Sequence, residues 1–127
     1  MKYLAFVLFA GSIAAAQSAD IAVPILKASY HTPVFKNEYI TFLNVYVPAG
    51  RNTGYHTHSA DAVSINSEEA DMTNQDFGAP KPGPARHSAH GVVNYSDFRK
   101  QSRSHRASNV GSTPRSEERR VGKECRL

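Results

Sequence analysis

Two histidines separated by one residue, His56 and His58, are the side chains of this sequence best suited to chemistry. They follow an apolar segment, Val45–Val47, and a Pro-Ala-Gly turn at 48–50. Side chains at positions i and i+2 of a β-strand project from the same face, so both imidazoles would point into whatever that strand lines. Imidazole nitrogen binds zinc, iron, nickel and copper, and in mixed sites manganese. The pair therefore predicts a chelating site for a divalent metal ion.

The spacing of Gly50, His56 and His58 resembles the first motif of the cupin superfamily, Gly-x5-His-x-His. His105, with Asn109 four residues later, matches the end of the second cupin motif. The resemblance covers most of the chain and implies an all-β fold, a small antiparallel β-barrel or jelly roll with a metal or ligand site in its mouth. It further implies that the three histidines are ligands of a divalent cofactor ion (Fe, Mn, Zn or Ni) and that Asn109 is structural.

The sequence also departs from the cupin pattern. In the family a glutamate follows the second histidine by four or five residues, where this chain has Ala62 and Val63, and the nearest carboxylate is Asp61. An offset of three along a strand turns Asp61 away from the face of His58, so Asp61 is a fourth ligand only if the backbone kinks there. The second motif lacks its proline and glycine. We therefore expect a site of three histidines with Asp61 as the candidate fourth ligand, a site completed by water, or an empty site.

Strands and turns should position these residues. β-branched and aromatic residues predict strands at 39–47, 62–66 and 91–95, with a plausible edge strand at 21–26. Prolines at 80–84 predict an irregular loop. No segment shows a sustained apolar period of 3.6 residues, so little helix is expected. The remaining histidines, His31, His87 and His90, are expected to be exposed in turns and loops.

The first 18 residues resemble a signal peptide, with Lys2, an apolar run at 3–10 and small residues at 14–16. The apolar run is shorter than the roughly 20 residues of a transmembrane helix. This predicts a secreted or periplasmic protein without a stable membrane anchor; an uncleaved anchor is the alternative.

The last residues differ in character from the rest. Arg115–Arg126 resembles, codon for codon, the translation of a common sequencing-adapter read, and a solvated charged tail is the alternative. Residues 21–114 are then a truncated cupin-like domain, whose natural sequence broke off near Pro114, and residues 115–127 an artefactual or disordered tail. The tail has few apolar side chains to offset the ordering of its backbone, about 1–2 kcal/mol per residue. We expect it to have no stable place in the fold, and the barrel to be incomplete at its C-terminus.

Charge and cysteine content exclude several classes of protein. Residues 17–114 carry nine basic and eight acidic side chains, a balance that predicts no nucleic-acid partner. The only cysteine, Cys125, lies in the tail, so no disulfide framework holds the domain. About one hundred residues suffice for one small domain.

Three functions are consistent with the sequence. The first is a metal-dependent enzyme, an oxygenase or an isomerase, and the second is a non-enzymatic module that binds a small-molecule ligand. The third is an exported β-domain used for protein contacts. A homodimer is implied only by the resemblance to cupins.

Overall fold

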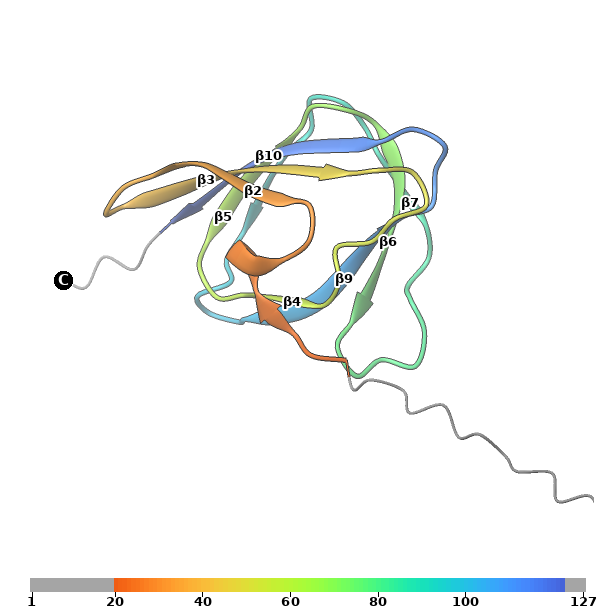
Figure 1. Ribbon diagram of the computed structural model, residues 1–127, viewed down its shortest axis with the longest axis horizontal. Coiled ribbons are helices and arrows are strands. Elements are labelled where there is room, and N and C mark those ends of the chain that lie inside the picture. Colours follow the sequence, from red (N-terminus) through yellow and green to blue (C-terminus); the bar gives the residue numbers. More distant parts are fainter. Residues whose placement is uncertain (1–19, 123–127) are drawn as a thin grey trace, which may run out of the picture.

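The computed structural model describes residues 20–122, whose regular secondary structure is almost entirely β-strand (Figure 1). One short 3-10 helix, η1 (Ile25–Lys27), accompanies ten strands: β1 (Val23–Pro24), β2 (His31–Lys36), β3 (Ile40–Val47), β4 (His56–His58), β5 (Ala62–Asn66), β6 (Ala70–Asp76), β7 (Arg86–Ser88), β8 (Val93–Ser96), β9 (Arg103–Asn109) and β10 (Arg115–Gly122). The proposed signal peptide lies outside the described residues. Within residues 20–122 we find no helix of the length and apolarity needed to cross a membrane.

The strands form two five-stranded sheets, one in the order β1-β4-β9-β6-β7 and the other in the order β2-β3-β10-β5-β8. All pairings are antiparallel except β1 with β4, where Val23 lies opposite His56. Figure 1 shows the two sheets curving around a common interior, with β10 and β3 on one side and β4 and β9 on the other. This confirms the prediction of an all-β jelly roll. The strand predicted at 62–66 is β5, and those at 39–47 and 91–95 correspond to β3 and β8.

The interior has an apolar part and a polar part. Alternate residues of β3 face inward, so that Leu43, Val45 and Val47 pack with Ile25 in the buried core. On β5 the polar side chains of Ser64 and Asn66 face inward and are buried, while the apolar side chains of Val63 and Ile65 face outward and are exposed. A strand that turns polar side chains inward is unfavourable for a plain core, since buried polar groups need partners. It indicates an interior built to hold polar groups.

The prediction for the C-terminal segment is wrong for residues 115–122. Arg115–Gly122 forms β10, which is hydrogen-bonded along its length to β3 and to β5, and so occupies the centre of its sheet. The prediction weighed only apolar content, which is low here. Two ladders of backbone hydrogen bonds and the burial of Glu117 between two arginines hold the strand instead. The expected gap in the barrel is therefore filled. The adapter origin of the segment stays a prediction.

Candidate metal site

Three histidines from two neighbouring strands converge in the interior. β4 and β9 are antiparallel with His56 directly opposite His105, and His58 follows two residues later on the same face of β4. All three side chains are buried, and one ring nitrogen of each lies within 4.8 Å of those of the others. The predicted convergence of His56, His58 and His105 is confirmed. The pleat of β4 and its register with β9 produce it together.

The turn before β4 orients the first of these rings. Gly50 and Gly54 have positive φ angles of 71° and 66°, a conformation that glycine adopts without strain. The carbonyl of Gly54 then accepts a hydrogen bond from Nδ1 of His56 over 3.1 Å. Because Nδ1 carries the proton, the lone pair of His56 is on Nε2. A backbone carbonyl that fixes the tautomer in this way is typical of a metal-binding histidine.

The other two rings contact each other and further side chains. Nε2 of His58 lies 3.0 Å from Nε2 of His105, and Nδ1 of His105 is buried with no hydrogen-bond partner among the described residues. Nη1 of Arg119 lies 3.2 Å from Nδ1 of His58. The ring of Phe98 stacks on His58, with centroids 4.5 Å apart.

Burial keeps these imidazoles neutral. Desolvation lowers the pKa of His58 to about 2 and that of His105 to about 3, and it also lowers the pKa of His56. Neutral imidazole is the form that binds a metal ion, because the cation has no free lone pair. Three buried, neutral and convergent imidazoles therefore fit a divalent transition metal.

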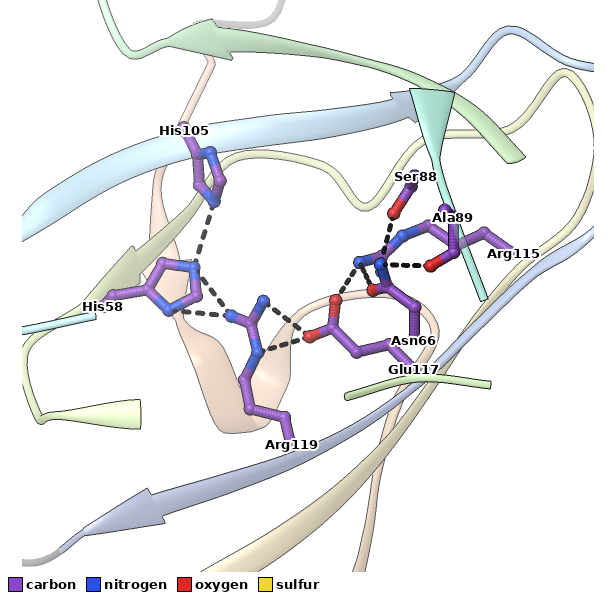
Figure 2. Close-up of polar contacts among 8 residues, drawn as sticks. All are labelled: His58, Asn66, Ser88, Ala89, His105, Arg115, Glu117 and Arg119. Carbon is purple, nitrogen blue, oxygen red and sulfur yellow. Dashed lines mark hydrogen bonds and ion pairs between the residues drawn. The ribbon is translucent and has the colours of Figure 1, made fainter. Parts of the chain in front are cut away.

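A chain of polar contacts leads away from the histidines (Figure 2). Nε of Arg119 donates a hydrogen bond to Oε1 of Glu117 over 2.7 Å, and Nη2 of Arg119 forms an ion pair with the same oxygen over 2.7 Å. Arg115 donates to the other oxygen of that carboxylate. Arg115 also donates to Asn66, whose amide donates to the side chain of Ser88. Burial lowers the pKa of both arginines to about 10, which leaves them charged. The site thus carries a fixed cation close to His58.

The three histidines and the residues of this polar network line one cavity of about 500 Å³. Four arginines line it, Arg86, Arg103, Arg115 and Arg119, against one carboxylate, Glu117. A cavity of this size is in the range that takes a small organic ligand.

The fold of this chain, but not its sequence, matches known proteins. No family model and no curated protein matches its sequence. Solved structures match its fold: a cupin domain from Bordetella pertussis is 20% identical with a TM-score of 0.65, over 82% of this chain and 99% of that one. An RmlC-like cupin family protein with a double-stranded β-helix fold from Methanocaldococcus jannaschii is 13% identical with a TM-score of 0.57, over 72% and 77% of the two chains. A sugar phosphate isomerase from a cupin superfamily, of Silicibacter pomeroyi, is 9% identical with a TM-score of 0.51, over 74% and 59%.

This chain has the cupin fold. The position expected to be structural in a cupin, Asn109, is buried and links three segments. Its amide donates to the carbonyls of Val47 and Thr113 over 3.0 and 2.7 Å, and its side-chain oxygen accepts from the backbone of Gly111. It fastens the end of β9 to the end of β3 and to the connection that leads into β10.

The structure does not bring Asp61 to the three histidines. Its carboxylate forms an ion pair with Arg99 and accepts hydrogen bonds from Tyr95 and from the backbone of Arg99, each over 3.2 Å. Asp61 lies in the connection between β4 and β5, which bends at Ala60 and passes from one sheet to the other, and there its carboxylate pairs with Arg99. Among the described residues, the group able to hold an ion consists of the three histidines alone.

The remaining histidines divide into two kinds. His87 and His90 are exposed, as predicted. His31 is buried, and its ring centroid lies 4.9 Å from that of His56, so the prediction of a surface position was wrong. Its place at the start of β2, opposite Val45, turns it into the interior.

Sequence reasoning also missed Arg119, because the segment that contains it was set aside. The alternation of Arg115, Glu117, Arg119 and Val121 along one face of a strand was the available signal. Phe98 gave no signal, since it lies on a turn between β8 and β9.

Proposed function

We propose that this protein binds one divalent transition-metal ion through His56, His58 and His105, and that it is a metal-dependent enzyme acting on a small molecule held in the adjoining cavity. The observation that carries the proposal is the convergence of three buried, neutral imidazoles at one point of the interior. Three protein ligands leave coordination positions for water or substrate, as in catalytic rather than structural metal sites. Iron, manganese, zinc and nickel are the candidate ions.

Each residue has a defined task in this proposal. His56 presents Nε2, with its other nitrogen held by Gly54. His58 and His105 face each other through their Nε2 atoms, so the one proton of the hydrogen bond between them must move to the Nδ1 atom of its own ring when an ion binds both rings. The ion would supply Lewis-acid or oxygen chemistry, the reaction types of an isomerase or an oxygenase. The arginines of the cavity favour a substrate with a carboxylate or phosphate group, since they bind such groups bidentately.

One of the structures with a similar fold suggests an isomerase: the Silicibacter pomeroyi protein is named as a sugar phosphate isomerase. Its likeness to this chain is one of fold, so it supplies a starting substrate class for assays. Secretion or periplasmic location, from the signal-like residues 1–18, is part of the same proposal.

The test begins with metal content. Purified protein incubated with each candidate ion should retain close to one ion per chain, measured by plasma mass spectrometry after gel filtration. His56→Ala and His105→Ala should lose this ion, whereas His90→Ala, a change at an exposed histidine, should keep it. Loaded protein is then assayed for oxygen consumption and for isomerisation of sugar phosphates. Equal metal content in the wild type and His56→Ala would overturn the ligand assignment.

One observation favours a second candidate, a module that binds an organic anion without metal. The cation of Arg119 lies beside His58, where Glu117 holds it, and the cavity is lined by four arginines against one carboxylate. In this case metal-free protein should be stabilised against heat by small carboxylates or phosphates, and addition of metal should not increase that effect. Stabilisation that requires metal would favour the enzyme.

A further inference from the structure

Phe98 lies on the connection between β8 and β9, and its ring covers one face of His58. The two rings are nearly parallel, with an angle of 26° between their planes. Phe98 lines the histidine cavity and also a second hollow of about 480 Å³, whose other walls include Asp76, Gln101 and Ser104. The ring of Phe98 is thus part of the wall that separates the two spaces.

The turn that carries Phe98 is held from outside by one side chain. Asp61 accepts hydrogen bonds from the backbone N–H of Arg99 and from the hydroxyl of Tyr95, and forms an ion pair with the guanidinium of Arg99. Its side chain is 15% exposed, whereas that of Arg99 is 53% exposed. The hydrogen bond from Arg99 lowers the pKa of Asp61 to about 2, so the carboxylate is ionised at neutral pH.

Asp61 and Phe98 are therefore connected to His58 by two routes. Asp61 follows His58 by three residues in the chain, at the exit from β4. Phe98 reaches the ring of His58 from the connection between β8 and β9, and stacks on it. Within residues 20–122, the turn from Phe98 to Lys100 pairs with no strand, and its other ion pair is that of Lys100 with Asp97, a residue of the same connection. Among the described residues, the ion pair with Asp61 is the one that joins this turn to another element.

We propose that Asp61 is a positioning residue that latches the Phe98 turn, keeps the Phe98 ring on His58, and closes the wall between the histidine cavity and the outer hollow. This chain would then use its carboxylate after the histidine pair to hold a wall of the site. Release of the latch would open a second approach to His58. The effect on bound metal rests on the proposed function, but the latch itself does not.

The first experiment needs no metal. Metal-free protein is treated with diethylpyrocarbonate, which modifies accessible neutral imidazoles, and the rate at His58 is followed by tandem mass spectrometry. The reagent should modify His58 about 2–10-fold faster in each of the variants Asp61→Ala, Phe98→Ala and Arg99→Ala than in the wild type. This is the range expected for loss of an aromatic stack. The control, Asp71→Ala, removes a carboxylate that pairs with exposed His87 and should leave the His58 rate unchanged.

A double variant tests whether Asp61 acts through Phe98. If it does, Asp61→Ala combined with Phe98→Ala should modify His58 no faster than Phe98→Ala alone, because the two changes remove one device. Rates that multiply would overturn the latch, as would a wild-type rate in both Phe98→Ala and Arg99→Ala. Should Asp61→Ala fail to fold, as judged by its thermal transition, Arg99→Ala breaks the same ion pair from its exposed side.

The second experiment measures the rate at which bound zinc passes to a chromogenic chelator. The three latch variants should keep the stoichiometry of the wild type and release zinc faster by a similar factor. Faster modification of His58 with no zinc bound by any protein would support the latch and contradict the proposed function. Zinc bound and released at the wild-type rate, with unchanged modification, would contradict the latch alone.

Discussion

Arg119 donates a hydrogen bond to Nδ1 of His58 over 3.2 Å, and the same guanidinium nitrogen lies 3.5 Å from Nε2. A fixed cation therefore lies beside both nitrogens of a candidate metal ligand. Its other donors are taken by Glu117, which holds it in this place. The arrangement makes Arg119 a competitor of any metal ion for His58.

Replacing Arg119 should therefore strengthen metal binding. Two unit charges about 4 Å apart repel by about 4 kcal/mol at an effective dielectric constant of 20. Even partial relief of this repulsion should raise the zinc affinity of Arg119→Met by about tenfold or more, since 1.4 kcal/mol is a factor of ten. Isothermal titration calorimetry measures it. Arg120→Met, at an exposed position on the same strand, is the control, and a lower affinity in Arg119→Met would show that the arginine assists the site instead.

Glu117 should be a major determinant of stability. Its side chain is 1% exposed and pairs with both Arg115 and Arg119, which are themselves largely buried. Glu117→Ala would leave two guanidinium groups without their counter-ion, a change that lowers the free energy of unfolding by about 3–5 kcal/mol for a buried pair. Urea denaturation should show this, while Glu118→Ala, at the exposed neighbour, should change stability by less than about 0.5 kcal/mol. Equal effects of the two substitutions would contradict the buried network.

Metal-free protein should lose stability in mild acid. Burial lowers the pKa of His31 to about 4, of His105 to about 3 and of His58 to about 2, whereas an unfolded chain titrates near pH 6.5. Below about pH 6.5 the unfolded state binds more protons than the folded state, so the free energy of unfolding falls as the pH falls. The slope should reach up to about 1.4 kcal/mol per pH unit for each histidine. Urea midpoints measured between about pH 7.5 and about pH 4.5 test this, and a constant midpoint would mean that these rings are not buried.

Removal of β10 should prevent cooperative folding. A chain that stops after Pro114 would expose the inner edges of both β3 and β5 and the apolar interior between them. The net stability of a domain is only about 5–15 kcal/mol, less than such a loss. The truncated protein should show no cooperative thermal transition by circular dichroism, whereas the 127-residue chain should show one. A truncated protein that melts cooperatively would mean that β10 is dispensable, and would support the foreign origin of this segment.

The sequence alone predicted part of the local structure, the strands at 39–47, 62–66 and 91–95, and the candidate metal-binding histidines. The i, i+2 spacing of His56 and His58 decides that both rings share a face, because the side chains of a strand alternate. The turn glycine and the distant His105 added the cupin resemblance, and with it the jelly roll and the position of a third histidine beside the pair. These predictions succeeded because each depends on spacing along the chain or on a pattern of residues.

Only the tertiary structure decided which other groups surround the histidines. His31, Phe98 and Arg119 reach the site from β2, from the turn between β8 and β9, and from β10. No local pattern marks them, because their proximity depends on how distant strands pair. The burial of Glu117 shows the reason most clearly. From its sequence alone, a strand with so many charges is expected to face solvent. Inside the sheet, two arginines pair with the carboxylate and two neighbouring strands hydrogen-bond to the backbone, so that the strand is stable there.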